Sequence, residues 1–364
     1  MTDLFWPGDE RAGSHFTAED FVGAMLAVEE EWLGRDLHVR VDAERLAHDA
    51  ESGGNPVIAL VRLLREHEPD VHRGLTSQDV VDSALMRMAS SAVETLRRDL
   101  RSVVDRLARL ADRHRETPMV ARTLTQHAVP TTFGFRAAAW LTAVLDAYDD
   151  LDRLALPDQV GGAAGTRAAI VELGRSVPEG VPRWHTTRAP MTRLGDALAG
   201  CTDACVRIAN DVLTMSRPEI GELAEGSGGG SSTMPQKANP TLSVLVRRAA
   251  LTTPQLATTL HLAAAQQLDD RADGGWHAEW ATLRDLVRRT LVAVSQTDDL
   301  LAGLVVHADR MAATLDSAGD GVLAEQRSMA SAAGRPPASS YLGDAVAHVG
   351  EVVARAHRTL EEKH

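Results

Sequence analysis

The sequence predicts an all-α protein built from long helices that pack into a bundle. Apolar residues recur at intervals of three and four over five long stretches, the spacing that places them on one face of a helix. Ala, Leu and Arg, which favour helices, fill much of the remainder. No stretch shows the sustained alternation with β-branched residues that is typical of strands. Because helices of this length exceed the width of a compact globule, we expect them to form a bundle.

The first long predicted helix covers residues 85–115, where the apolar positions run from Leu85 to Leu110. At a rise of about 1.5 Å per residue, it would be roughly 45 Å long. The same spacing predicts four further helices, at residues 133–154, 192–215, 240–267 and 279–304.

Glycine- and proline-rich stretches interrupt this pattern, and such stretches mark turns and loops. They lie at residues 51–56, 159–166, 226–232 and 334–338. We expect three consecutive regions: an N-terminal helical domain over residues 1–84, a central long-helix bundle over residues 85–304 and a short C-terminal helical region over residues 305–364.

The composition is that of an ordinary globular protein. Of 364 residues, 44% are hydrophobic and 24% are charged, which excludes a wholly disordered chain. No apolar run approaches the ~20 residues that a membrane span needs, and the acidic start lacks the features of a secretory signal, so we expect a cytoplasmic protein. The net charge of −13 argues against nucleic acid or an anionic membrane as a partner. It is compatible with a small anionic substrate bound by a local cluster of basic and hydroxyl side chains.

The cysteines and one histidine motif are the candidates for a metal site. Cys201 and Cys205 are four residues apart on a predicted helix, with no cluster nearby to complete a zinc site. We expect both to be buried thiols in a reducing compartment. His277 and Glu279 are two residues apart, so they do not share a helix face. We therefore expect no metal.

The stretch 230–240 is the richest in chemistry. Asn239 is a good N-cap and Pro240 suits the first position of a helix, whose positive end would point back at this stretch. Lys237 adds a full positive charge. These features predict an anion site, and the preceding glycines would let the loop close over a ligand. The alternative is a flexible linker followed by a capped helix.

Residues 231–240 read Ser-Ser-Thr-Met-Pro-Gln-Lys-Ala-Asn-Pro, which resembles the signature of the fumarase/aspartase superfamily. Residues 74–84 and 121–134 resemble the first and second substrate-binding regions of that superfamily. The resemblance runs from about residue 24 to about residue 323. It implies a fumarase/aspartase-like bundle of long helices, with a reduced C-terminal domain because this chain is shorter than most members.

In the first of these regions, Thr76 is placed to cap a helix, with Asp79 at the third position in a capping-box arrangement. This could be no more than a helix start. The resemblance implies that Thr76, Ser77 and Gln78 bind a carboxylate of the substrate.

In the second region, the resemblance implies that Arg122, Thr123 and Gln126 bind substrate. Many members have a histidine for proton transfer where this chain has Leu124. His127 follows three residues later, about one helical turn on, and would reach the same pocket if the segment were helical. His127 is therefore the candidate for the second proton-transfer role.

Several strings are most similar to the bacterial 3-carboxy-cis,cis-muconate cycloisomerases; they are residues 71–79, 123–128, 160–166, 184–188 and 276–280. The His-Asp-Val expected of adenylosuccinate lyases is missing, because His48 and Asp49 lie out of register. The resemblance implies a cycloisomerase that interconverts 3-carboxy-cis,cis-muconate and a carboxymuconolactone in aromatic-acid breakdown. One alternative is a C–N or C–O lyase of the same superfamily that releases fumarate; another is an inactive helical binding protein.

The shared chemistry of the superfamily is addition or elimination next to a carboxylate, without a cofactor. By resemblance, Ser231 transfers the proton at carbon, with Ser232 as the alternative, and Lys237 favours the serine alkoxide. Asn239 would join the substrate-binding donors around a tricarboxylate. The resemblance also implies a homotetramer whose sites form where different subunits meet. The sequence leaves open whether the residues at 184–188, or Arg247 and Arg248, line the pocket or are structural.

Overall fold

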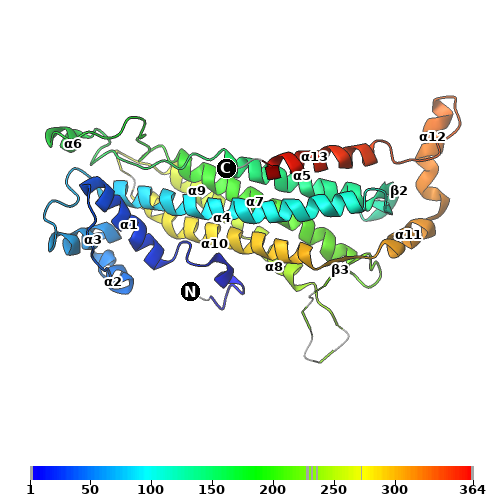
Figure 1. The fold of residues 1–364 in the computed structure, drawn as a ribbon, viewed down its shortest axis with the longest axis horizontal. Helices are drawn as coiled ribbons and strands as arrows, with labels where there is room; N and C mark the ends of the chain where they lie inside the picture. Colours follow the sequence, from blue (N-terminus) through cyan, green and yellow to red (C-terminus); the bar gives the residue numbers. More distant parts are fainter. Residues whose placement is uncertain (1–2, 227–228, 231–232, 235–236, 272, 362–364) are drawn as a thin grey trace. The chain divides into compact units, whose positions relative to one another are not determined.

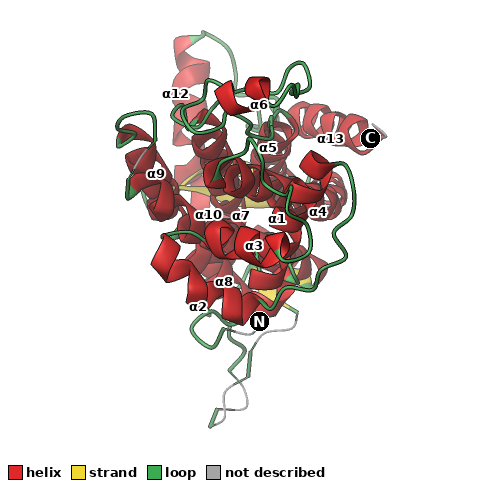
Figure 2. Ribbon diagram, turned by 90° about the vertical axis from the view of Figure 1, so that its left-hand side faces the viewer, coloured by secondary structure: helices red, strands yellow, loops and turns green. Residues whose placement is uncertain are grey.

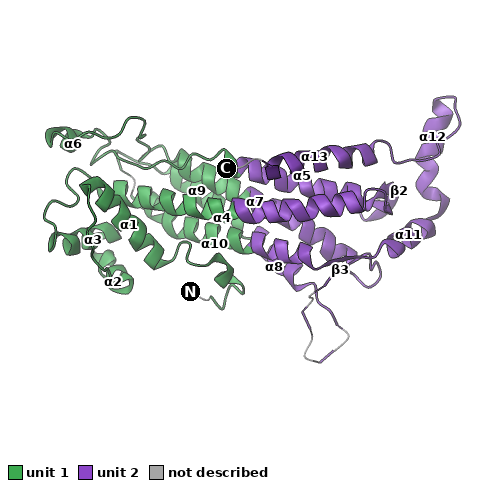
Figure 3. Cartoon of the chain, in the orientation of Figure 1, with its two compact units in different colours: residues 1–96, 151–199, 252–292 green, residues 97–150, 200–251, 293–364 purple. Residues whose placement is uncertain are grey.

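The computed structural model describes residues 3–226, 229–230, 233–234, 237–271 and 273–361. The chain divides into two compact units, each assembled from three segments (Figure 3). Unit 1 comprises residues 1–96, 151–199 and 252–292, and unit 2 comprises residues 97–150, 200–251 and 293–364. The division into three consecutive domains stays a prediction. Contacts within one chain group the residues into these two units instead.

Long helices dominate the fold, which confirms the all-α prediction (Figures 1 and 2). Four predicted helices are found: α4 (Ser77–Arg113), α5 (Phe133–Asp152), α7 (Ala189–Met215) and α10 (Gly275–Ala302). Their bounds lie within a few residues of those expected, except that α4 begins eight residues earlier than predicted. Their apolar stripes are buried, and Leu96, Leu100 and Leu107 of α4 are fully so. Burial of these stripes supplies most of the stability of such helices.

The fifth predicted helix, over residues 240–267, is wrong in its extent. Two helices occupy it: α8 (Thr241–Ala250) and α9 (Thr253–Ala265). Pro254 lies in the first turn of α9. A proline has no N–H to donate and its ring clashes with the preceding turn, so it begins a helix rather than continuing one.

Unit 1 also contains the N-terminal helices, whose starts are capped by side chains. Thr17, Asp42 and Asn55 each accept a hydrogen bond from a backbone N–H of the first turn that follows. The helices that they precede are α1 (Ala18–Leu33), α2 (Ala43–Gly53) and α3 (Pro56–Arg65). Unit 1 also contains a 3₁₀ turn, η1 (Asp9–Ala12), and a short helix, α6 (Ala168–Glu172).

The described residues of unit 2 form two small antiparallel sheets that the sequence did not predict. β1 (Pro118–Thr123) pairs with β2 (Gln126–Thr132), and β3 (Leu223–Glu225) pairs with β4 (Leu304–Val306). The remaining elements of this unit are α11 (Ala308–Ser317), η2 (Gly319–Leu323), α12 (Ala324–Ala332) and α13 (Ala345–Glu361). The β1–β2 hairpin packs against α11, η2 and α13.

Cys201 and Cys205 are free and fully buried in α7, as expected. Burial raises the pKa of both, that of Cys205 to about 11, so both remain thiols. Within the described residues, no helix has the length and apolar character that crossing a membrane requires.

Candidate active site

The first predicted substrate-binding region lies at the start of α4 in unit 1. Thr76 immediately precedes the helix, and its N–H donates to Oδ2 of Asp79 at 3.0 Å. This confirms the half of the expected capping box that Asp79 provides. It fixes the backbone of Thr76 and Ser77 at the helix end.

The Asp79 carboxylate also binds the glycine-rich loop. It accepts hydrogen bonds from the N–H groups of Gly161, at 2.7 Å, and Gly162, at 2.9 Å. Burial raises the pKa of Asp79, and the backbone hydrogen bonds from Gly161, Gly162 and Thr76 oppose that rise. One buried carboxylate therefore joins two stretches that are more than 80 residues apart in sequence.

Arg271 is a residue of this region that the sequence did not single out. Its guanidinium donates to Oγ1 of Thr76 and, at 3.2 Å, to the carbonyl of Ala163 in the glycine-rich loop. A guanidinium and a hydroxyl are both able to donate hydrogen bonds to a carboxylate, and the two groups lie side by side here. The indication in the sequence that Arg271 belongs to the site is its position in an otherwise acidic loop just before the 276–280 motif.

Gln78 is positioned differently from Thr76. Its side chain is 1% exposed, and its Nε2 donates to the backbone carbonyl of His185 at 2.9 Å. The burial favours a role in holding the 184–188 segment over direct contact with substrate.

The 184–188 and 276–280 motifs meet in a buried ionic cluster. Arg188 forms ion pairs with Asp82 and Glu279, and Asp82 also accepts from the indole of Trp276 at 2.9 Å. All three charged side chains are inaccessible to solvent. Arg188 therefore has a structural role at the starts of α4, α7 and α10.

The second region, residues 122–127, forms the tip of the β1–β2 hairpin in unit 2. Leu124 and Thr125 form a two-residue turn with φ of 48° and 70°, as in a type I′ turn. The conditional prediction of a helical turn between Leu124 and His127 is therefore wrong. Because side chains alternate along strands, Arg122 and its partner His127 face one side, and Thr123 and its partner Gln126 face the other.

Arg122 connects this hairpin to the segment before the signature. Its guanidinium binds the Glu222 carboxylate with both terminal nitrogens, and Glu222 is fully buried. Glu222 immediately precedes β3, which leads into the stretch 226–240. Thr123, Gln126 and His127 are exposed at the hairpin tip.

The base of the signature stretch is closed by two sets of hydrogen bonds. Gly229 and Asn239 exchange backbone hydrogen bonds of 2.9 Å. Glu225 accepts from the N–H groups of Leu242 and Ser243, at 3.1 and 2.8 Å, and from the Ser243 hydroxyl.

The prediction that Asn239 caps the following helix is therefore wrong. Pro240 is the N-cap residue and makes no side-chain cap, while the Glu225 carboxylate binds the first turn of α8. The expected anion site at this helix end is already filled by a carboxylate of the protein. Lys237 is exposed, and Ser231 and Ser232 lie outside the described residues.

The sequence-predicted residues are thus divided between the units. Unit 1 carries Thr76, Ser77 and Gln78, and unit 2 carries the hairpin-tip residues, Lys237 and Asn239. Among the described residues, no group of three or more His, Cys, Asp or Glu side chains is arranged to hold a metal ion.

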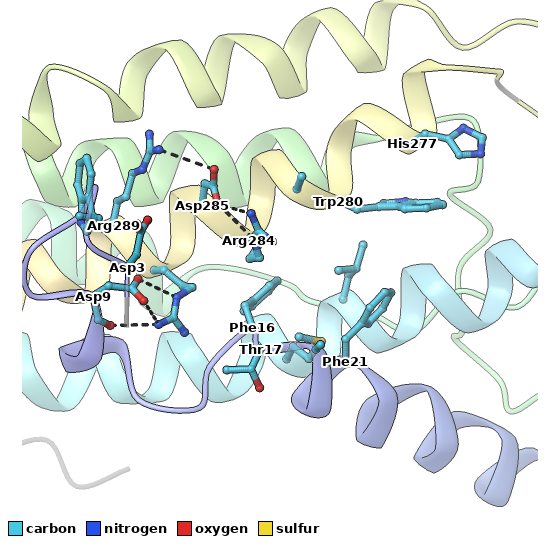
Figure 4. Close-up of a pocket in the computed structure, with 16 residues that line it drawn as sticks. Asp3, Asp9, Phe16, Thr17, Phe21, His277, Trp280, Arg284, Asp285 and Arg289 are labelled. Atoms are coloured by element: carbon cyan, nitrogen blue, oxygen red, sulfur yellow. Dashed lines mark hydrogen bonds and ion pairs between the residues drawn. The ribbon is translucent and has the colours of Figure 1, made fainter. Parts of the chain in front are cut away.

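A cavity of about 570 Å³ lies elsewhere in unit 1 and contains none of the predicted site residues (Figure 4). Phe16, Phe21 and Trp280 form part of its apolar wall. Its buried Arg288 is bound by the Asp9 carboxylate. Arg284 and Arg289 in its lining pair with Asp285. Because these arginines are already bound by carboxylates of the protein, the cavity does not identify the site of an anionic substrate.

Comparison with known proteins places this chain in a family. A model of a lyase family matches residues 10–254. Nitrosuccinate lyase of Streptomyces davaonensis is 40% identical over 319 residues, which is 79% of this chain and 67% of that protein. The 3-carboxy-cis,cis-muconate cycloisomerase of Bradyrhizobium diazoefficiens is 37% identical, over 89% of this chain and 75% of that protein.

Solved structures of similar fold support the same family. A 3-carboxy-cis,cis-muconate lactonizing enzyme from Pseudomonas putida has a TM-score of 0.78 at 28% identity, with 95% of each chain covered. A fumarate lyase from Mesorhizobium sp. BNC1 has a TM-score of 0.82 at 25% identity, with 97% of this chain and 100% of that chain covered. The chain therefore belongs to the lyase family with the fumarase/aspartase helical fold.

Proposed function

We propose that this enzyme interconverts 3-carboxy-cis,cis-muconate and a carboxymuconolactone in aromatic-acid breakdown. The observation that carries the proposal is the carboxylate-binding pair of Thr76 and Arg271, held by Asp79 and the glycine-rich loop. The similarity to cycloisomerases over most of the chain supports the choice of substrate.

In the lactone-opening direction, a base removes the proton from the carbon next to a carboxylate. We assign this role to Ser231, with Ser232 as the alternative; the serine takes the proton and the electron pair spreads into the carboxylate as an enediolate. The ring C–O bond then breaks, its electrons stay on the departing carboxylate oxygen, and a diene forms. In the reverse direction the same carboxylate oxygen adds to the diene.

The remaining donors stabilise negative charge. Lys237 favours the serine alkoxide, because a nearby positive charge favours the ionised form of an acid. Thr76, Ser77, Arg271 and Asn239 hold the carboxylates and the enediolate, as preorganised donors do in acyl and enolate chemistry. None of these steps uses a cofactor.

The hairpin-tip donors complete the assignment. Thr123 and Gln126 bind a carboxylate, and His127 is the second proton-transfer group. Arg122 acts through its ion pair with Glu222, which fixes the hairpin.

A second candidate is the elimination of nitrite from nitrosuccinate, favoured by the 40% identity to a nitrosuccinate lyase. The first step is the same deprotonation next to a carboxylate. The C–N bond then breaks instead of a C–O bond, and its electrons leave with nitrite, so the products are fumarate and nitrite. This is the C–N lyase alternative in a specific form.

We further propose that the enzyme is a cytoplasmic homotetramer. The exposed donors of the hairpin tip support this, since a second subunit would bring a substrate and further groups against them. Light scattering of an active preparation should give four subunit masses. A mass of one subunit in that preparation would contradict the proposal.

One set of assays separates the reactions. Turnover of 3-carboxy-cis,cis-muconate removes the ultraviolet absorbance of the conjugated diene, nitrosuccinate turnover releases nitrite, and adenylosuccinate turnover releases fumarate. We expect turnover of the muconate, and loss of at least 10²-fold in kcat in Ser231→Ala or Ser232→Ala. Turnover of nitrosuccinate alone would establish the second candidate, and turnover of neither would overturn both.

A further inference from the structure

His185 lies in a segment that is fixed on both sides beside the first substrate-binding region. The N–H of Trp184 donates to Oε1 of Gln159 at 2.7 Å. The carbonyl of His185 accepts from Gln78 at 2.9 Å. Because Gln78 follows Thr76 and Ser77 on α4, the backbone of His185 is tied directly to that region.

The imidazole of His185 lies against the glycine-rich loop. A Cβ atom added to Gly165 would lie within 2.2 Å of its Cε1 and 2.6 Å of its Nε2, so only glycine leaves room for the ring. Gly165 also has φ of 73°, a conformation that favours glycine. The same loop provides Ala163, whose carbonyl binds Arg271. The ring of His185 and the guanidinium of Arg271 therefore pack on one loop.

The two ring nitrogens of His185 differ in their surroundings. Nδ1 is buried and has no hydrogen-bond partner within the described chain. Nε2 is not in that position, since it is not both buried and without a partner. A buried N–H without a partner is rarer and more costly than an unpartnered acceptor. The neutral ring is therefore expected to carry its proton on Nε2, as an accessible donor.

His185 differs in its neighbours from two other histidines of the chain. His72 binds Glu29 and His261 binds Asp196, each at hydrogen-bond distance. Across the described ranges, no carboxylate pairs with His185, and the nearby Asp79 carboxylate binds Gly161 and Gly162 instead. The imidazole is therefore available to an anion from outside the chain.

We propose that His185 is a substrate-binding residue, whose Nε2–H donates to a carboxylate held by Thr76 and Arg271. This inference rests on the proposed function, because it concerns the same anionic substrate. The 184–188 motif would then have two roles: substrate binding through His185 and the buried ionic cluster through Arg188.

The test is equilibrium binding of two unreactive anions, tricarballylate and succinate, measured by calorimetry on the full-length protein. His185→Gln and His185→Asn form a matched pair, because the Gln amide reaches about as far as Nε2 and the Asn amide about as far as Nδ1. We expect His185→Asn to raise the Kd at least tenfold and His185→Gln to stay within about threefold of wild type. His48→Gln is the control, since that side chain is 90% exposed. The unfolding midpoints of all variants should agree.

Thr76→Val separates the two proposals. If it weakens binding while both His185 variants bind as wild type, the role of His185 is overturned and the proposed site stands. Equal weakening by Asn and Gln would also overturn the inference, because it would not depend on the Nε2 position. If the wild-type protein binds neither anion, or Thr76→Val binds as tightly as wild type, the anion site at this position is overturned together with the inference.

Discussion

The Arg122 guanidinium binds both oxygens of the Glu222 carboxylate, at 2.9 and 2.7 Å, with Glu222 fully buried. The pair joins the hairpin tip to the strand that leads into the signature stretch. Removing one partner of a buried ion pair leaves an uncompensated charge and typically costs 3–5 kcal/mol. Arg122→Met should therefore lower the free energy of unfolding by about 3 kcal/mol, measured in urea. Arg122→Met with Glu222→Leu should recover most of that loss; equal instability of the single and double variants would contradict this account.

The cluster of Arg188, Asp82 and Glu279 predicts a pH dependence of stability. Two buried carboxylates share one guanidinium, and burial raises the pKa of Glu279 above its ordinary value of 4.5. Between that value and the raised one, the folded protein holds a proton that the unfolded chain has released. The associated stability is present below pH 4.5 and is lost as the pH rises through the folded pKa, by about 1.4 kcal/mol for each pH unit across that window.

Glu279→Gln removes this titration. Urea unfolding of wild type and Glu279→Gln from pH 4.5 to 8 should show a negative slope in the wild type that is shallower in the variant, where buried groups such as Asp79 still titrate. Parallel curves would show that Glu279 does not carry the effect.

Glu225 closes the base of the signature stretch by binding the first turn of α8. Glu225→Ala should lower the free energy of unfolding by about 1–2 kcal/mol, the usual effect of losing a helix cap. It should also lower kcat/KM about tenfold or more, because Lys237 and Asn239 lie on the stretch that it closes. Glu219→Ala is the matched control, an exposed carboxylate six residues earlier. Unchanged kinetics in Glu225→Ala would separate the cap from the site.

The turn of Leu124 and Thr125 places two side chains at positive φ, where Asn-Gly is preferred. Leu124 is 95% exposed, so its replacement removes no packing within the chain. Leu124→Asn with Thr125→Gly should raise the free energy of unfolding by about 1 kcal/mol. Thermal unfolding of the double variant and of each single variant measures this. A fall in stability would show that Leu124 is covered by a contact that the single chain lacks.

The sequence predicted the long helices well, because α4, α5, α7 and α10 bury regular stripes that local spacing reveals. The hairpin escaped prediction for local reasons too. β1 buries two adjacent residues, Met119 and Val120, instead of alternating ones, and its turn contains neither glycine nor asparagine.

The candidate site was predicted less completely, because its contacts are long-range. Asn239 looks like a cap until Glu225, fourteen residues earlier, is seen to bind the helix start. Likewise, Arg271 gains meaning only through its contact with Thr76, 195 residues away. Residue type and spacing identified the segments, whereas tertiary contacts decided which side chains are free.

The paired backbones of Gly229 and Asn239 bring the two ends of the stretch between them to one point. Transplanting residues 230–238 from a relative should therefore exchange chemical preference between family members without refolding the scaffold. Natural substitutions confined to this stretch would then change the substrate preference of a family member and leave its helices unchanged.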